Sequence, residues 1–321
     1  MDTVVFLFAV LSAVSCVQYD GLRVKFGNSD ALADVNYFYT IPRTMSEVEN
    51  EGWQRMERPP GPLPDLRMYC PPGRNVCPLY DTAGFVAGLM VAMPVDEYVA
   101  PIIKPEKKYV KWQAPASEGE PAREFWTATL YFVSEESLKA GAGPQVENGA
   151  TLQDGGVWVA DLDGRLMRVP STEAELTSTP FKKQNCLPYM GTHYYYNMTT
   201  EMNCDNLLPW FALVSDGELI GMGFQMFGIL PAQKPRDWFE TFPSAKAAVQ
   251  AIVPYAPTCM VDWGDKYNFV SLHIYFVNEP WTIKCRTGDS IAPAPPLDRL
   301  MLNGYRYINQ ISDEVIKLIS G

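Results

Sequence analysis

The chain contains only two histidines, His193 and His273. Histidine has the side chain whose unperturbed pKa lies nearest neutral pH, so it is the usual group for proton transfer and a common metal ligand. Both residues lie in aromatic runs, and we expect them to share one site. The candidate catalytic residues are His193, His273, Tyr195 and Tyr275, and the further aromatic residues expected to line the site are Tyr194, Tyr196, Trp210 and Phe211.

Each histidine also has a structural interpretation, because a histidine in a strand is most often a hydrogen-bonded packing residue. A metal site would need a carboxylate such as Glu201, Asp205 or Asp262 beside the two histidines. The sequence has no His-x-His or His-Glu-x-x-His spacing, so we expect no metal.

Motifs of other site classes are absent from the sequence. It has no Gly-x-Ser-x-Gly turn for a serine nucleophile and no phosphate-binding P-loop. The glycines over residues 221–228 lie in a strand-like run and do not open a helix, which disfavours a dinucleotide site. We therefore expect no nucleotide cofactor.

Three segments of the first half recur, in the same order, in the second half. Residues 42–48, 81–88 and 129–135 are echoed by residues 170–176, 216–223 and 273–279. In this alignment Thr129 stands where His273 stands, and neither histidine has a counterpart in the first half. The echoes predict two related domains, and they favour the second domain as the one that carries the site.

The cysteines indicate a disulfide framework. One of the seven, Cys16, lies in the predicted leader, which leaves an even number, as is typical of an extracellular protein. The repeat predicts the pairs Cys70–Cys77 and Cys186–Cys204 as equivalent bridges, which leaves Cys259–Cys285.

The N-terminus is typical of a secretory signal peptide over residues 1–16. The apolar run over residues 4–14 is too short to span a bilayer and ends in small residues, although Asp2 replaces the usual positive charge. Asn197 begins an Asn-Met-Thr glycosylation sequon, which is used only in the secretory pathway.

Composition excludes several classes of partner. The chain has 321 residues, 47% of them hydrophobic, and a net charge of −11, so it is globular and unsuited to phosphate backbones. We expect no nucleic-acid partner and no membrane insertion.

The secondary structure is expected to be mostly strands. Runs rich in β-branched and aromatic residues predict strands over residues 125–133 and 269–277, and residues 155–164 predict a strand that enters a hairpin. Helices are predicted from Phe242 to Val249 and over residues 309–319.

Together these patterns predict a β-rich α+β protein with two tandem related domains from an internal duplication. We expect a signal peptide (1–16), an N-terminal domain (17–155) and a C-terminal domain (156–321). The function we expect is that of a secreted glycoprotein enzyme that acts on a small, partly aromatic molecule. An oxidoreductase of the cofactor-independent oxidase or luciferase type is favoured over an unfamiliar hydrolase. The alternative is an extracellular ligand-binding or matrix glycoprotein without catalysis.

Overall fold

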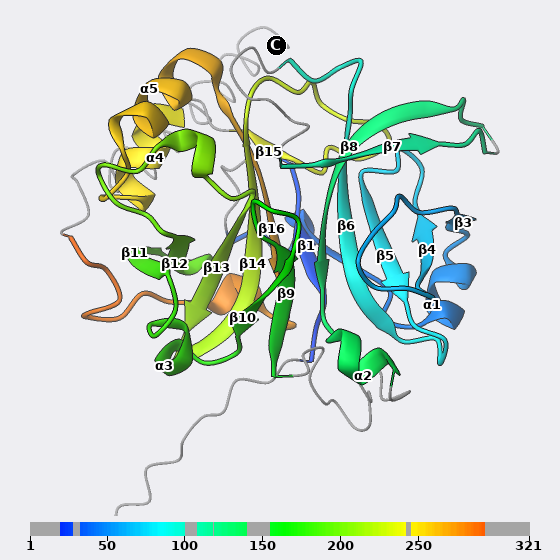
Figure 1. Ribbon diagram of the computed structural model, residues 1–321, viewed down its shortest axis with the longest axis horizontal. Coiled ribbons are helices and arrows are strands. Elements are labelled where there is room, and N and C mark those ends of the chain that lie inside the picture. The colour runs from blue at the N-terminus through cyan, green and yellow to red at the C-terminus, as the bar shows by residue number, and fades with distance from the viewer. Residues whose placement is uncertain are drawn as a thin grey trace, which may run out of the picture.

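The computed structural model describes residues 20–27, 33–99, 108–117, 119–139, 155–241 and 245–292. The predicted leader, the first three residues of the helix expected from Phe242, and the helix expected over residues 309–319 lie outside the described residues. The described chain is β-rich and forms two eight-stranded antiparallel sheets (Figure 1).

The first sheet has the strand order β10–β9–β8–β6–β5–β4–β3, and β7 also pairs with β8. Its strands are β3 (Gln54–Met56), β4 (Arg67–Cys70), β5 (Val76–Tyr80), β6 (Val86–Pro94), β7 (Val110–Ala114), β8 (Arg123–Tyr131), β9 (Gly156–Ala160) and β10 (Leu166–Pro170). All nine residues of β6 are buried, as expected for a continuous apolar run at the centre of a sheet covered on both faces.

The second sheet has the order β11–β12–β13–β14–β16–β1–β2, and β15 also pairs with β16. Its strands are β1 (Arg23–Lys25), β2 (Phe38–Thr40), β11 (Phe181–Leu187), β12 (Gly191–Tyr196), β13 (Trp210–Ser215), β14 (Glu218–Phe227), β15 (Glu240–Thr241) and β16 (Phe269–Tyr275). The hairpin β1–β2 therefore extends a sheet built mainly from the second half of the chain. The hairpin β9–β10 extends the sheet of the first half, and the domain boundary expected after residue 155 stays a prediction.

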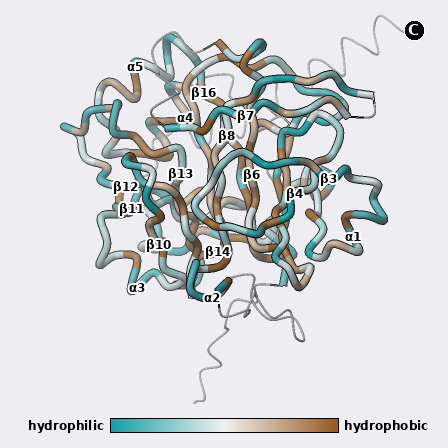
Figure 2. The backbone as a smooth tube through the Cα atoms, turned by 45° about the vertical axis from the view of Figure 1, so that its right-hand side comes forward, coloured by the Kyte–Doolittle hydropathy of each residue, from teal (hydrophilic) through white to brown (hydrophobic). Residues whose placement is uncertain are grey.

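The two sheets pack face to face around one core. Alternation along each strand sends side chains to opposite faces, so Leu130 lies in the core between the sheets while Tyr131 lies on the outer face of the first sheet. Likewise, Tyr194 lies between the sheets and Tyr195 lies on the outer face of the second sheet. Apolar chain follows the central strands β6 and β14 (Figure 2).

Two short helices begin with the same kind of N-terminal cap. In α1 (Met45–Asn50) the hydroxyl of Thr44 accepts a hydrogen bond from the backbone N–H of Glu47, and in α3 (Glu173–Leu176) Thr172 does the same for Glu175. Such threonine caps satisfy N–H groups that have no partner within the helix. A third short helix is α2 (Glu135–Lys139), and the 3₁₀ turns are η2 (Val35–Tyr37), η4 (Cys204–Asn206) and η5 (Pro280–Thr282).

A helix pair, α4 (Ala245–Ile252) and α5 (Thr258–Tyr267), covers the outer face of the second sheet (Figure 1). The helix predicted up to Val249 is confirmed in α4. In contrast, α5 was not predicted, because no side chain caps its start and Gly264 interrupts its interior. Gly264 lies against the start of α4, where a Cβ would be in ordinary contact, 3.4 Å from the backbone of Ala245.

All six cysteines of the described residues form disulfides, but not all in the predicted pairs. Cys70–Cys77 is confirmed, whereas the other two bridges are Cys186–Cys285 and Cys204–Cys259. The predicted pairs Cys186–Cys204 and Cys259–Cys285 are wrong, because they were taken from the repeat and the described residues of the first half have no counterpart of α5. The actual bridges hold α5 to η4 and the segment after η5 to β11.

The predicted strands over residues 125–133 and 269–277 are confirmed in β8 and β16, and the predicted hairpin is confirmed in β9 and β10. None of the helices in the described segments is long and apolar enough to cross a membrane.

Candidate functional site

The four candidate residues gather on the outer face of the second sheet, beneath the pair α4–α5. His193 and Tyr195 come from β12, and His273 and Tyr275 come from β16, two strands separated by β13 and β14. The imidazole centroids of His193 and His273 lie 6.0 Å apart with nearly perpendicular planes. The structure therefore brings the two histidines together, while their role stays a prediction.

The ring of Phe211 packs against both histidines. Its ring centroid is 5.3 Å from that of His193, 5.5 Å from that of His273 and 4.9 Å from that of Tyr195. The ring occupies the space above Gly223, where a Cβ would lie 1.8 Å from Cζ of Phe211. The absence of a side chain at Gly223 of β14 therefore leaves the space in which the Phe211 ring contacts both histidines.

Gly223→Ala is expected to displace the Phe211 ring and to destabilise the fold by about 1–3 kcal/mol, the usual cost of overpacking a core. The three atoms nearest to the added Cβ all belong to this ring. Thermal unfolding of Gly223→Ala, Phe211→Leu and the double variant measures the effect. Because leucine removes the clashing atoms, the double variant should lose less stability than the sum of the single losses. Additive losses would contradict this arrangement.

His273 is held by a buried ion-pair network. Its Nδ1 is hydrogen-bonded to Oε2 of Glu240, and Nζ of Lys25 lies 2.9 Å from Oε1 of the same carboxylate. Lys25 and Glu240 are both completely buried. Burial alone would raise the pKa of Glu240, but the charges and hydrogen bonds of Lys25 and His273 outweigh it and lower the pKa to about 2. Glu240 therefore accepts a hydrogen bond from Nδ1–H of His273 and fixes the tautomer of the imidazole.

The pairing of strands explains how these three side chains meet. Lys25 of β1 stands directly opposite His273 of β16, and Glu240 of β15 stands opposite Ser271, two residues earlier on β16. The strands β1 and β15 pair with successive parts of the same edge of β16. The side chains of Lys25, Glu240 and His273 meet where these two pairings adjoin.

His193 is held by the backbone. Its Nδ1 lies 3.2 Å from the carbonyl oxygen of Asn185 on β11, so Nδ1 carries the proton that is donated. Burial, reinforced by the nearby His273, lowers the pKa of His193 to about 3 against the opposing effect of its hydrogen bonds. The imidazole of His193 is thus neutral throughout the physiological range.

Both histidines therefore have one ring nitrogen in a hydrogen bond and one without a partner. The Nε2 atoms of His193 and His273 are buried, and neither has a hydrogen-bond partner among the described residues. A buried polar atom without a partner costs about 1–3 kcal/mol and calls for an explanation. This pair of unpartnered Nε2 atoms is the strongest chemical feature of the site.

The two tyrosines form walls of the site. Burial raises the pKa of Tyr195 and of Tyr275, so both phenols are neutral at physiological pH. The hydroxyl of Tyr275 donates to the carbonyl of Tyr189 at 3.2 Å, and the ring of each tyrosine is nearly parallel to the imidazole on its own strand. The structure thus gives the tyrosines a packing contact with the histidines.

Other candidates from the sequence lie elsewhere. Tyr194, Tyr196 and Trp210 point into the core between the sheets, because they occupy the alternate positions of β12 and β13. The carboxylates considered for a metal site, Glu201, Asp205 and Asp262, are exposed. Among the described residues, no group of three or more His, Cys, Asp or Glu side chains could hold a metal ion.

Lys25, Glu240 and Asn185 were not predicted as site residues from the sequence. A signal was present for Glu240, which is the only charge in the aromatic run Trp238-Phe239-Glu240-Thr241-Phe242. A single carboxylate in such a run is expected to be buried with a partner. Lys25 alternates with Val24 and Phe26, so its pattern indicated a solvent-facing position.

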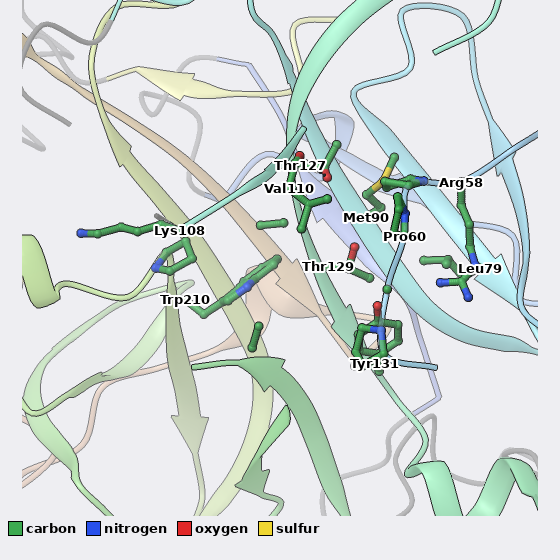
Figure 3. Close-up of a pocket in the computed structure, with 16 residues that line it drawn as sticks. Arg58, Pro60, Leu79, Met90, Lys108, Val110, Thr127, Thr129, Tyr131 and Trp210 are labelled. Carbon is green, nitrogen blue, oxygen red and sulfur yellow. Dashed lines mark hydrogen bonds between the residues drawn. The ribbon is translucent and has the colours of Figure 1, made fainter. Parts of the chain in front are cut away.

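The first sheet has a small pocket beside Thr129, the residue that stands where His273 stands in the second sheet. There β7 pairs with β8 as far as Thr127 and β9 pairs from Leu130, which leaves Ala128 and Thr129 between them. The cavity of about 70 Å³ is lined by Thr129, Tyr131, Met90 and Trp210 among others (Figure 3). Neither histidine lines it.

No family model, curated protein or solved structure matches this chain. The fold and the histidine site therefore carry the functional argument by themselves.

Proposed function

We propose that the protein is a secreted glycoprotein enzyme that acts on a small, partly aromatic molecule without a nucleotide cofactor. The observation that carries this proposal is the pair of buried histidines, each oriented through Nδ1 and each with an unpartnered Nε2. Orientation of one imidazole nitrogen by a carboxylate or carbonyl, with the other nitrogen left for the substrate, is the usual arrangement of a histidine base.

The two histidines have different roles in this proposal. His273, oriented by Glu240, is the general base, because the carboxylate stabilises the imidazolium that forms when Nε2 takes a proton. His193 stays neutral, since protonating both rings 6.0 Å apart would place two like charges in an apolar site. Its Nε2 can accept a hydrogen bond and position the substrate.

The aromatic walls define the substrate class. Phe211, Tyr195 and Tyr275 offer ring faces to a flat molecule, and a buried base removes a proton best from a weakly acidic O–H or C–H group. Such proton removal is the first step of a cofactor-independent oxidase, with dioxygen as the oxidant. It is also compatible with a hydrolase that activates water, and we favour the oxidase because no serine or cysteine of the described residues is hydrogen-bonded to either histidine.

Access to the site requires movement of the pair α4–α5. Ala248, Val249 and Met260 of these helices belong to the same apolar cluster as Phe211 and Tyr275. The disulfide Cys204–Cys259 ties the start of α5 to η4, whereas α4 carries no disulfide and is the helix of the pair that we expect to move.

Secretion and glycosylation are part of the same proposal. Three disulfides suit an oxidising compartment. Asn197 is exposed at the turn that follows β12, with φ of 51°, so its amide is accessible to a glycosyltransferase.

We also infer that the two halves arose by duplication. In the strand orders β3–β4–β5–β6–β8–β9–β10 and β11–β12–β13–β14–β16–β1–β2, the first five strands follow the chain in the same way. A pair of strands then completes each sheet, β9–β10 after β8 in one and β1–β2 from earlier in the chain in the other. Further support comes from the starts of α1 and α3, where Met45 N–H donates to Gly84 and Glu173 N–H donates to Gly217, each at 2.8 Å. These contacts align Gly84 with Gly217, so the second turn is shorter than the sequence echo implied.

A binding or matrix glycoprotein without catalysis is the second candidate, and the complete burial of both histidines favours it. His193 is 0% exposed and His273 is 1% exposed. In that case the network would be a buried polar group that stabilises the sheet.

Modification by diethyl pyrocarbonate, a small reagent for neutral imidazoles, separates the two candidates. We expect the native protein at pH 7 to gain modification at His273 or His193, located by peptide mass spectrometry, because a catalytic site must open to a small molecule. Protein unfolded in urea, in which both histidines react, is the control. If neither histidine reacts in the native protein over hours, the enzyme proposal is wrong and the non-catalytic candidate stands.

A further inference from the structure

The ion pair of Lys25 and Glu240 differs from the other ion pairs of the described chain in being entirely buried. Both side chains are 0% exposed, and Nζ lies 2.9 Å from Oε1. Every other lysine pair in the described residues is at least partly exposed, such as Lys183 with Glu173, at 29% for each partner. A charge pair that has lost all contact with water stabilises a fold poorly, because the cost of removing both ions from water offsets their attraction.

We propose that Lys25 and Glu240 become joined by an isopeptide bond between Nζ and Cδ. Three features of the site support this reaction. The amine and the carboxyl group are held in contact by strands that share one edge of β16. Nδ1 of His273 is hydrogen-bonded to Oε2, the second oxygen of the Glu240 carboxyl group. Apolar and aromatic surroundings, including the Tyr37 ring 5.9 Å from Nζ, exclude water.

The reaction begins with a proton transfer inside the pair. The Lys25 ammonium passes one of its three protons to Oε1 of Glu240, which leaves a neutral amine and a neutral carboxylic acid. The ion pair is the predominant form, but full burial reduces its advantage over the neutral pair, because a low-dielectric interior disfavours separated charge. The neutral pair is the reactive form.

The bond then forms with loss of one water molecule. Nζ attacks Cδ, and negative charge that develops on Oε2 is stabilised by Nδ1–H of His273, in the manner of an oxyanion donor. A second proton moves from the nitrogen to Oε1, which leaves as water, and Oε2 becomes the amide carbonyl. The third proton stays on the amide nitrogen, so atoms and charges balance without any oxidant or co-reactant. Because the fold holds the two groups in contact, the reaction is intramolecular and does not require them to be brought together from solution.

The bond would supply a cross-link that the disulfides do not. Cys70–Cys77 lies within the first half, and the other two bridges lie within the second half. Lys25 belongs to the N-terminal strand β1, which has only three residues, and Glu240 belongs to the second half. A cross-link between such distant parts of a chain restricts the unfolded state strongly.

The bond would keep the orientation of the His273 imidazole but change its electrostatics. The amide oxygen of the product would accept the same hydrogen bond from Nδ1–H of His273, whereas the negative charge of the carboxylate, which the proposed mechanism uses to stabilise the imidazolium, would be lost. Absence of the bond would leave the histidine site intact, and absence of activity would leave the bond intact.

Mass spectrometry of the reduced, deglycosylated protein tests the proposal. We expect a mass lower by one water than the mature sequence, and a digest that yields one branched peptide containing both Lys25 and Glu240. Trypsin should fail to cleave after Lys25. Recovery of the two segments as separate, unmodified peptides from the wild-type protein would overturn the proposal, whatever the variants do.

Two controls accompany this measurement. Lys25→Arg keeps the positive charge but has no amine that can form this amide, so it should show the full mass. Lys183 and Glu173 form an ion pair of 3.1 Å whose side chains are partly exposed to solvent. They should appear in separate peptides of the wild-type digest. A cross-link between Lys183 and Glu173 would indicate artefactual coupling and would also count against the proposal.

Discussion

Replacing His273 with glutamine should lower turnover by at least about 100-fold, because general base catalysis by a positioned histidine contributes about 10²–10⁴-fold. Glutamine fills similar space but cannot take a proton at Nε2. The assay uses an imidazopyrazinone luciferin with oxygen uptake for the oxidase branch and 4-nitrophenyl acetate for the hydrolase branch. His193→Gln should also lower turnover, and the double variant should lose much less than the product of the two single losses, because the residues act as one unit.

A matched control exists on the other sheet. Thr129 of β8 stands opposite Met90 of β6, as His273 of β16 stands opposite Gly223 of β14. Thr129→Val should therefore leave turnover unchanged. Melting temperatures of all variants are measured in parallel, because a structural histidine would lower stability and activity in proportion. Full activity in His273→Gln would remove this residue from the mechanism.

The two histidines illustrate what the sequence could predict. They were the only titratable imidazoles, and their absence from the echoed positions of the first half pointed to one region. The structure places them 6.0 Å apart across two intervening strands. The packing around the two rings involves Phe211 above Gly223, however, and the need for a glycine beneath an aromatic ring cannot be seen before the register of β13 and β14 is known.

The contact between Lys25 and Glu240 could not be predicted from the sequence. Their meeting depends on β1 and β15 sharing one edge of β16, and that pairing joins segments from opposite ends of the chain. Local pattern determines which residues form a strand but not which distant strand pairs with it. The wrong disulfide pairs have the same origin, since Cys259 lies on α5, which has no counterpart in the described part of the first half.

The burial of His193 implies a specific weakness toward acid. The pKa of this imidazole is about 3 in the folded protein and near its ordinary value of 6.5 in the unfolded chain. Between pH 3 and pH 6.5 the imidazole of His193 is protonated in the unfolded chain and neutral in the folded protein. The free energy of unfolding should therefore be at its full value above pH 6.5 and should fall as the pH drops toward 3.

The expected slope is about 1.4 kcal/mol per pH unit for one proton, so His193 alone should remove on the order of 2–3 kcal/mol between pH 6.5 and 4.5. Urea unfolding at several pH values measures this loss. In His193→Gln the contribution of this proton disappears, so the variant should lose less stability than the wild type over the same range. Tyr195→Phe, a neighbour on the same face of β12 that does not titrate there, should keep the wild-type slope. Equal slopes in the wild type and His193→Gln would show that this imidazole is protonated in the folded protein, and a neutral partner for His273 would then no longer be available to the proposed mechanism.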